Sequence, residues 1–541
     1  MIQILINSFK LKQDERIWDF IMFLILCVLV ISLPTSRAFV SITQGLLAAN
    51  WLAGRDFKEK LQRFSANKPA VYLVALFFVY VIGLLWTGDL NYGVGQVLKD
   101  KLPFLSLVFV VSSSRMIPEE RIHSLFILFS LSVLFATLIG FITYVSGNFT
   151  DTRELSPFIL HVHLSMMIVL TIFLFPWVAK QLNISRTWYY ASILVSVWLL
   201  FYLFILSSLT GILSLLGVGL FVLLRFVFRK PVLLRVALVS FVFLAGALAS
   251  FYVINQVTKP LSLSIEPDPA SLQELTAEGN PYLHNFQDDL RENGHLVYFF
   301  ISDNELRKAW NSRSYIDFDS LDEAGNEIRY TIYRYLSSRG LRKDKEGLSN
   351  IDENEVQAIE RGVVNYLHLD WPMLMVRLHQ TLWEYQEYQR TRDPHGHSFT
   401  KRIEIWRGTW LAFTRYPILG WGTGDVLHAI DFGLEKMNSK LEDHRLRHPH
   451  NQFLHVLVMM GIVGFIIIFG LIFFFIKSSG AVRFFPFNIF LIIMFVSMLG
   501  NSPLDSQISL NFFLFFCLVF GISLKNNAAL YPEKRQNSDD I

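Results

Sequence analysis

The chain has 541 residues, of which 52% are hydrophobic and 17% charged, and its formal net charge at pH 7 is +3. Together with a mean hydropathy of +0.40, this composition is typical of a multi-spanning membrane protein and argues against a soluble enzyme. The basic residues are scattered among loops without a dense patch, so we expect no nucleic-acid partner.

Apolar runs long enough to cross a bilayer predict about twelve transmembrane helices, nine of them before a long hydrophilic segment and three after it. The second and fourth are the weakest, because they are short or interrupted by polar residues. The expected helices cover residues 17–34, 37–53, 69–87, 101–114, 121–147, 157–180, 188–206, 208–228, 232–254, 450–476, 482–500 and 507–524.

The distribution of basic residues orients this bundle. Loops on the side of the N-terminus carry many lysines and arginines, whereas opposite loops such as 88–96 and 501–506 carry none. The positive-inside rule therefore places both ends of the chain in the cytoplasm. The predicted domains are transmembrane helices 1–9 at 1–254, a large non-cytoplasmic loop domain at 255–449, transmembrane helices 10–12 at 450–524, and a cytoplasmic tail at 525–541.

The large loop is predicted to be mainly helical. Helical patterns occur near 353–369 and 371–392, and the stretch 399–415 has the pattern of an amphipathic helix at a membrane surface. The stretch 285–350 is polar and mixed, and its pattern supports no assignment.

The strongest candidate site lies where the hydrophilic segment meets the tenth apolar helix. His450 and Asn451 stand at this boundary, and Gly461 and Gly464 follow them. Eleven residues are close to three helical turns, so His450 and Gly461 are predicted to share the face that small residues press against neighbouring helices. An inward-facing imidazole at this depth is a functional candidate. Alternatively, the histidine is an interfacial residue and the glycines only aid helix packing.

A second candidate site is cationic. Arg402 precedes Trp406 by four residues and leads into a glycine-rich stretch that contains Gly422 and Gly424. The arginine and tryptophan could equally be interfacial anchors. The glycines could form a flexible turn, and as a phosphate-binding loop they give a weak signal.

A third candidate is Arg153, an arginine in a loop that the charge rule places outside the cytoplasm. Its alternative role is an ion pair with Asp151 or Glu154. His161 and His163 begin the sixth span about 200° apart on the helix, so they cannot bind one metal from one face. We interpret both as packing or hydrogen-bonding histidines and predict no metal site.

The run Arg402-x-x-x-Trp406, the run Pro417-Ile-Leu-Gly-Trp-Gly-x-Gly424, and His450-Asn451 followed after nine residues by Gly461-x-x-Gly464 resemble the O-antigen ligase and polymerase superfamily. Its members are bacterial inner-membrane enzymes that move glycans from an undecaprenyl diphosphate carrier on the outer face of the membrane. The predicted architecture is similar too, with a large periplasmic loop before the last helices. Residues 334–344 look similar to a loop variant of Bacteroidetes-type members.

The resemblance implies a catalytic role for His450 and Arg402, and a further family arginine near the outer end of the sixth span fits Arg153. We expect His450 to accept the proton of the attacking hydroxyl. Arg402 and Arg153, together with Asn451, are expected to bind the diphosphate. Structural roles at the site are expected for Gly461, Gly464, Trp406, Gly422 and Gly424.

One position departs from the family pattern. Many relatives have Ser-Arg-x-Gly in a middle helix, whereas this chain has leucine at position 209, within Ser208-Leu-Thr-Gly211. Any diphosphate contact of that arginine must be absent or supplied by another residue. No acidic metal-ligand cluster is in view, so arginines are expected to replace a divalent ion, and no cofactor is expected. Direct displacement would invert the anomeric centre.

The expected function is therefore an O-antigen ligase that joins a carrier-linked glycan to lipid A–core at the periplasmic face of the inner membrane. Alternatives with the same donor are a repeat-unit polymerase and a protein O-oligosaccharyltransferase. A polysaccharide transporter or flippase is the alternative of another class, and it would need polar residues deep in several spans. The expected partners are the undecaprenyl diphosphate-linked donor, a hydroxyl acceptor and membrane lipids.

Overall fold

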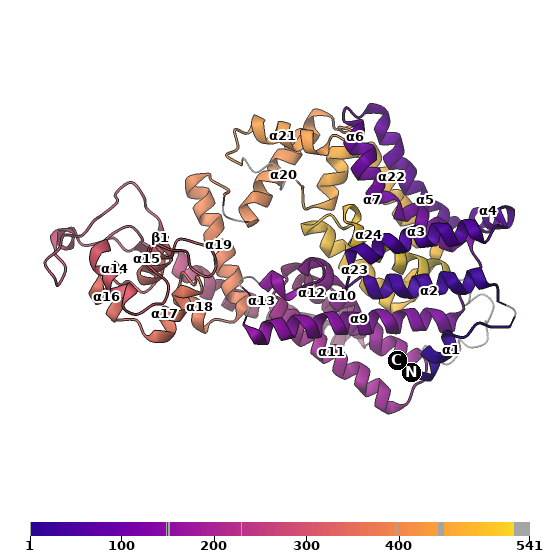
Figure 1. The fold of residues 1–541 in the computed structure, drawn as a ribbon, viewed down its shortest axis with the longest axis horizontal. Helices are drawn as coiled ribbons and strands as arrows, with labels where there is room; N and C mark the ends of the chain where they lie inside the picture. The colour runs from indigo at the N-terminus through magenta and orange to yellow at the C-terminus, as the bar shows by residue number, and fades with distance from the viewer. Residues whose placement is uncertain are drawn as a thin grey trace. The chain divides into compact units, whose positions relative to one another are not determined.

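The computed structural model describes residues 2–13, 15–147, 149, 152–228, 230–395, 398–441 and 448–523. In this part of the chain the fold is mainly helical, and the one sheet is a pair of two-residue strands (Figure 1). The predicted helical class is confirmed. The predicted cytoplasmic tail at 525–541 and Asp151, the suggested partner of Arg153, lie outside the described residues.

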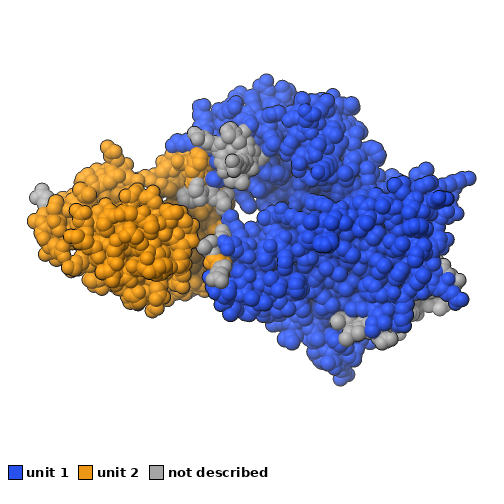
Figure 2. Space-filling model, in the orientation of Figure 1, with its two compact units in different colours: residues 1–147, 152–223, 401–541 blue, residues 148–151, 224–400 orange. Residues whose placement is uncertain are grey.

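The chain forms two compact units (Figure 2). Unit 1 consists of residues 1–147, 152–223 and 401–541, and unit 2 consists of residues 148–151 and 224–400. These units are defined by contacts between residues, whereas the division at 254, 449 and 524 follows the expected membrane topology. That division stays a prediction.

Within the residues that the structure describes, seven helical segments are long and apolar enough to cross a membrane, and all of them match predicted spans. They are Lys68–Trp86 (α5, Lys68–Ile82, with η1, Gly83–Trp86), α9 (Glu119–Ser146), α10 (His161–Gln181), α11 (Arg186–Leu206), α12 (Leu209–Val227), α13 (Val232–Leu261) and α22 (Gln452–Ser479).

Shorter apolar helices match three further predicted spans. They are α2 (Ile17–Ser32), α23 (Phe485–Gly500) and Gln507–Ser523, which combines α24 (Gln507–Leu518) with η9 (Val519–Ser523). The two weakest predicted spans are helical as well. They correspond to α3 (Arg37–Ala53) and to a series of short helical pieces between residues 90 and 113. A multi-pass membrane protein is supported, and the count of twelve stays a prediction.

The fourth predicted span is irregular. Two π-helical stretches, η2 (Gly93–Leu98) and η3 (Phe104–Phe109), alternate with α6 (Leu90–Tyr92), α7 (Lys99–Lys101) and α8 (Val110–Ser113). Proline at position 103 has no N–H for the helical ladder, which favours a break there. Lys101 directly precedes this break and is only 1% exposed.

An aromatic core holds the first and last parts of unit 1 together. Phe126 and Phe129 on α9 pack against Phe512, Phe516 and Phe520 of α24 and η9 in stacked and edge-on pairs, with ring centroids 5.1 to 6.1 Å apart. Aromatic pairs at this separation add favourable electrostatic contact to packing. The remaining described elements of unit 1 are α1 (Ile2–Ser8), α4 (Phe57–Ala66), η4 (Thr152–Leu155), α21 (Val426–Lys436), η7 (Ala481–Arg483) and η8 (Pro503–Asp505).

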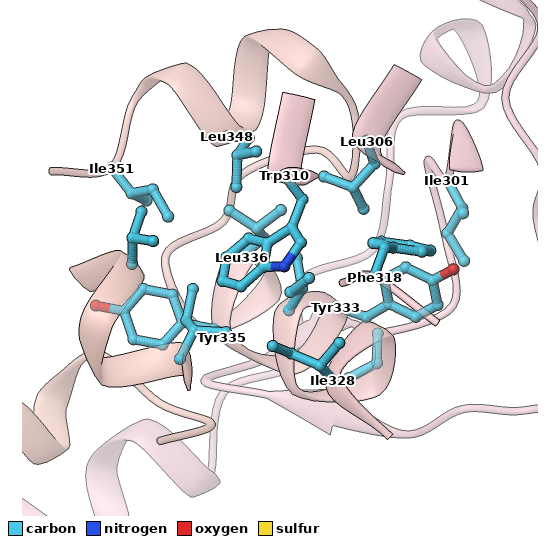
Figure 3. Close-up of a cluster of buried hydrophobic side chains, with 14 residues drawn as sticks. Ile301, Leu306, Trp310, Phe318, Ile328, Tyr333, Tyr335, Leu336, Leu348 and Ile351 are labelled. Carbon is cyan, nitrogen blue, oxygen red and sulfur yellow. The ribbon is translucent and has the colours of Figure 1, made fainter. Parts of the chain in front are cut away.

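Unit 2 has its own hydrophobic core within the stretch that the sequence left unassigned. Trp310, Tyr335 and Leu336 are fully buried within it (Figure 3). Short elements surround this core, each too brief to give a clear periodicity. They are η5 (Pro269–Gln273), β1 (Arg291–Glu292), β2 (His295–Leu296), α14 (Asp303–Asn311), α15 (Ile328–Ser338) and α16 (Lys345–Ser349).

The helices predicted in the second half of the loop are present. The pattern at 353–369 corresponds to α17 (Glu353–Glu360) and α18 (Leu367–Asp370), and the pattern at 371–392 to α19 (Met373–Thr391). Asp352 and Glu355 form a capping box that fixes the start of α17. The amphipathic stretch 399–415 is α20 (Ser398–Arg415), which spans the boundary between the two units.

Candidate active site

His450 lies just before helix α22 and not on it. Its φ is +46°, and the helix begins at Gln452 with Asn451 as the capping residue. Asn451 Oδ1 accepts the N–H groups of Phe453 and Leu454, each at 3.0 Å. Such a cap satisfies backbone donors that have no partner inside the helix. The sequence placed His450 within the helical repeat, and this was wrong because the asparagine cap starts the helix after it.

Gly461 interrupts α22 one third of the way along it. Its φ of +63° and ψ of −170° lie in a region that is essentially restricted to glycine. The predicted shared face of His450 and Gly461 is therefore wrong for a second reason, since no continuous helix connects them. Gly461 is nevertheless buried, as is Gly464.

The loop at 417–424, between α20 and α21, forms hydrogen bonds with the backbone of α22 on both sides of this interruption. Pro417 and Ile418 carbonyls accept the N–H groups of Ile462 and Val463, at 2.8 and 3.2 Å. In return the loop donates two N–H groups to the carbonyls of α22: Trp421 N–Val458 O and Gly422 N–Met459 O, each 2.9 Å. Broken helices in membrane proteins require such replacement partners.

The glycines of the loop allow close approach to the neighbouring backbone. A Cβ on Gly420, which has a φ of +71°, would lie 2.5 Å from the Met459 carbonyl oxygen. Gly424 N donates to Thr87 Oγ1 at 2.7 Å, and Thr423 N donates to the Gly83 carbonyl at 3.2 Å. The N–H groups from 421 to 424 thus all have protein acceptors. The loop is a docked structural element, and these N–H groups are not a phosphate cradle.

Asp425 ends the docked loop and ties it to the residues that follow η1. Its carboxylate accepts the Thr87 hydroxyl at 2.8 Å and the N–H groups of Gly88 and Asp89. Burial raises the pKa of Asp425, but these hydrogen bonds outweigh burial and hold the pKa below its ordinary value. The charged carboxylate therefore keeps the loop in place at neutral pH.

Three segments meet around His450. Arg402 on α20 donates from Nη1 to the Gly500 carbonyl at 3.1 Å, and Asn451 Nδ2 donates to the Leu499 carbonyl at 3.0 Å. Both acceptors belong to the last turn of α23, whose carbonyls lack helical partners and carry partial negative charge. The structure thus brings together Arg402 and the His-Asn pair, which are far apart in the sequence.

Trp406 has a defined role in this arrangement. Its Nε1 donates to the Pro449 carbonyl at 2.6 Å, so α20 holds the turn immediately before His450. That Trp406 is needed for the site stays a prediction.

The environment of His450 makes its imidazole a weak base. Burial lowers the pKa of His450, and the positive charge of Arg402 and the neighbouring His448 lower it further, to about 3. The sequence alone suggested an ordinary imidazole that titrates near neutral pH. Burial is the main reason for the difference, and the arginine that the structure places nearby adds to it. At pH 7 the ring is neutral and able to accept a proton.

Arg153 lies in η4, which packs against α9, α10 and α11. The Tyr202 hydroxyl holds this short helix by donating to the Leu155 carbonyl at 2.5 Å. Arg402 and Asn451 contact the end of α23 instead, so a shared ligand with Arg153 stays a prediction.

His163 behaves as expected for a hydrogen-bonding histidine. It is buried, and its Nε2 lies 3.3 Å from the Ser506 hydroxyl. No metal-binding role is needed to explain its position.

The structure also shows a buried polar cluster that the sequence analysis missed. One ligand-type atom from each of His448, His455 and Asp505 lies within 4.8 Å of the other two. Gln452 Nε2 donates to Asp505 Oδ2 at 2.8 Å, and Lys101 Nζ donates to Asp505 Oδ1 at 2.5 Å. The two histidines stand seven residues apart next to the His-Asn motif, and this spacing was the available signal. Nothing local in the sequence pointed to Lys101 or Asp505.

The ammonium group of Lys101 determines whether this cluster can bind a metal ion. Two imidazoles and a carboxylate are a donor set that suits zinc. The carboxylate, however, is already paired with Lys101, which occupies the place of a cation. Burial raises the pKa of Asp505, but the nearby His455 and Lys101 outweigh burial and hold it well below its ordinary value. The cluster is best described as a buried ion pair that supports the turn before α22.

Leu209, where the resemblance implies an arginine, begins α12. The adjacent Thr210 accepts a hydrogen bond from Asn501 Nδ2 at 3.2 Å. Asn501 directly follows Gly500, whose carbonyl binds Arg402. The start of α12 therefore lies beside the site, and the polar contact there is made by Thr210.

Comparison with known proteins gives one match to a family model. Residues 363–469 match a family model described as O-antigen ligase. The matched segment contains every predicted site residue except Arg153. No curated protein matches the chain.

Proposed function

We propose that this chain, which belongs to the O-antigen ligase superfamily, is a glycosyltransferase that moves a glycan from an undecaprenyl diphosphate carrier to a hydroxyl acceptor. The observation that carries the proposal is the pairing of a neutral, half-buried imidazole, His450, with the guanidinium of Arg402. One group can accept a proton, and the other can bind phosphate oxygens.

In the proposed reaction, an acceptor hydroxyl attacks the anomeric carbon while its proton passes to His450. The bond between that carbon and the diphosphate oxygen breaks, and the electron pair leaves with the diphosphate. Arg402 stabilises the negative charge that develops on the leaving group, with Arg153 and Asn451 as further ligands. Direct displacement inverts the anomeric centre, and the scheme uses no metal ion.

Donor binding would also activate the base. The guanidinium of Arg402 contributes to the low pKa of His450 in the free protein. A bound diphosphate carries negative charge and compensates that guanidinium. The pKa of His450 would then rise, so the base becomes stronger once the donor is present.

The preferred acceptor is lipid A–core at the periplasmic face of the inner membrane. A repeat-unit polymerase or a protein O-oligosaccharyltransferase would use the same donor chemistry. A flippase would not require the pairing of His450 with Arg402, which makes the transferase the better proposal.

The test compares His450→Ala and Arg402→Lys with the parent chain in a deletion strain. His450→Ala should lower the rate of transfer by about 10²- to 10⁴-fold, the usual contribution of a general base. Arg402→Lys keeps the charge but loses the bidentate geometry, so it should also reduce transfer. Arg407→Lys, at an exposed position on the same helix, is the matched control and should transfer normally.

Gel analysis of lipopolysaccharide from the deletion strain identifies the acceptor. Loss of all capped molecules with accumulation of carrier-linked polymer indicates a ligase, and capping by single repeats indicates a polymerase. Unchanged lipopolysaccharide with underglycosylated envelope proteins indicates the protein-directed enzyme. Normal transfer by inserted His450→Ala protein would refute the proposed mechanism.

A further inference from the structure

Unit 2 contains a cavity of about 220 Å³. Its walls come from the β1 strand, from α15 and from one face of α19, all of which lie within this unit. Pockets for drug-sized ligands usually measure about 300–1,000 Å³. The cavity therefore suits a single small ring or side chain.

One wall of the cavity is fixed before any ligand binds. Arg334 donates from Nε and Nη2 to one carboxylate oxygen of Glu292, at 2.7 and 2.6 Å. The same guanidinium lies over the ring of Trp383, 4.1 Å from its centroid, and the indole Nε1 donates to the Arg291 carbonyl at 3.2 Å. Asn365 Nδ2 donates to the other oxygen of Glu292 at 3.0 Å.

This arrangement cancels the positive charge of the wall. Arg334 is paired with the Glu292 carboxylate, which is only 1% exposed, so the ion pair as a whole presents no net charge to an anion. Glu384 also lines the cavity and adds an acidic group. A phosphate or a carboxylate ligand is therefore disfavoured.

His379 provides the observation that points to a ligand. The residue lines the cavity and is only 2% exposed. Its Nδ1 lies 3.1 Å from His368 Nε2, and its own Nε2 has no hydrogen-bond partner among the described residues. A buried polar atom without a partner is unfavourable and rare in folded proteins. A ligand in the cavity can supply the missing hydrogen bond.

The neighbouring polar groups on α19 define the chemistry of that ligand. Gln380 offers an amide donor and an amide acceptor, and Glu384 offers carboxylate acceptors. Burial lowers the pKa values of His368 and His379, to about 3 and 4, so both imidazoles are neutral. Two neutral imidazoles, an amide and a carboxylate around an aromatic side chain complement a ring that carries several hydroxyl groups.

We propose that this cavity binds a neutral sugar residue of the glycan substrate, at a site within unit 2. This inference rests on the proposed function, because it specifies where that enzyme holds the saccharide part of a substrate. A site of this kind acts on substrate affinity. Its disruption should raise the KM for the glycan and leave kcat nearly unchanged.

The test measures binding directly, with the full-length protein in nanodiscs. Saturation-transfer difference NMR is recorded with a panel of methyl hexosides and methyl N-acetylhexosaminides, and in parallel with a panel of neutral tripeptides. His379→Phe and Gln380→Ala should each reduce the glycoside signal at least five-fold. His395→Ala and Gln357→Ala, at exposed positions of the same unit, are the matched controls and should keep it.

The outcomes separate the alternatives. Glycoside binding that requires His379 and Gln380 supports the proposal, whereas no glycoside signal, or a signal unchanged in both variants, overturns it. Peptide binding that depends on His379, without glycoside binding, would also overturn it and assign the cavity to a peptide. The assay needs no turnover. If the protein binds glycosides but its His450→Ala variant still transfers glycan normally, the cavity keeps its proposed role. Only the proposed catalytic mechanism would then be refuted.

Discussion

His450 illustrates how one residue acquires its chemistry from its neighbours. Its imidazole is half-buried beside a guanidinium and a second imidazole, and burial together with these two groups lowers its pKa to about 3. Because the neutral form is the proton acceptor, a depressed pKa extends the active form toward low pH. The same depression weakens the base, and a diphosphate that compensates Arg402 would relieve the part of the depression that this arginine causes.

The pH dependence of transfer should reflect this environment. The kcat/KM of a general base falls as pH decreases through its pKa in the free enzyme. We therefore expect kcat/KM to stay nearly constant from about pH 7 to about pH 5, below the ordinary histidine pKa of about 6.5. The acidic limb of kcat should lie at higher pH, because the bound donor raises the pKa of His450. Initial rates with purified protein in nanodiscs measure both. An acidic limb of kcat/KM centred near pH 6.5 would contradict the assignment.

The buried pair of Lys101 and Asp505 is a second prediction at the residue scale. Lys101→Met leaves the carboxylate buried without its partner and should destabilise the fold by about 3–5 kcal/mol. Adding Asp505→Asn removes the charge, keeps an acceptor for Gln452 and should recover most of the loss. Lys58→Met, at an exposed position, should have little effect.

A thiol-reactive dye can follow this unfolding, since both cysteines, Cys27 and Cys517, are buried. Lys101→Met should lower the temperature at which the dye reacts, and the double variant should raise it again. Equal unfolding temperatures for the parent and Lys101→Met would show that the ion pair does not support the fold.

At the scale of elements, the interruption of α22 organises the site. The docked loop at 417–424 supplies the backbone partners that the helix lacks on both sides of Gly461. The same loop is continuous with α20, which carries Arg402 and Trp406. The break in one helix therefore fixes the position of another helix that contributes to the site.

Gly461→Ala tests this relation. An added Cβ would lie 2.2 Å from the Ile418 carbonyl oxygen, on a backbone with a φ of +63°. We expect a lower unfolding temperature and a loss of transfer, because the docked loop must move away. Gly470→Ala is the matched control on the same helix, since an added Cβ there meets nothing within 4 Å.

The control should be neutral or stabilise slightly, by about 0.5–1 kcal/mol, because alanine favours a helix more than glycine does. Unfolding temperature and transfer activity are measured for both variants. Normal activity and stability of Gly461→Ala would mean that the interruption is not required.

For the whole molecule, the membrane topology is the main prediction. The positive-inside rule places residues 255–449 outside the cytoplasm and the loop around Lys58 inside it. In a chain whose cysteines are replaced by alanine, we expect Ser349→Cys to react with a membrane-impermeant maleimide added to spheroplasts. Lys58→Cys should react only after the membrane is permeabilised. Both positions are exposed, so labelling reports their side of the membrane. The opposite labelling pattern would reverse the topology and remove the periplasmic assignment.

Local sequence was sufficient to locate the helices. Apolar runs of membrane-spanning length depend on side-chain hydrophobicity alone, and every predicted span corresponds to helical structure in the described residues. Local sequence was insufficient to locate the helices in residues 285–350. The helices there have only five to eleven residues and form through contacts with a shared core around Trp310. Short elements have too little periodicity to be recognised without those contacts.

By itself, the sequence determined the membrane class, the positions of the long apolar helices and the residues that resemble the O-antigen ligase superfamily, because hydrophobic runs and short motifs are local properties. Only the tertiary structure brought Arg402 beside His450, paired Lys101 with Asp505 and seated the docked loop in the break at Gly461. These contacts join segments that are distant in the chain, so they depend on how the helices pack. The same packing sets the burial and the charges around His450, and with them its pKa.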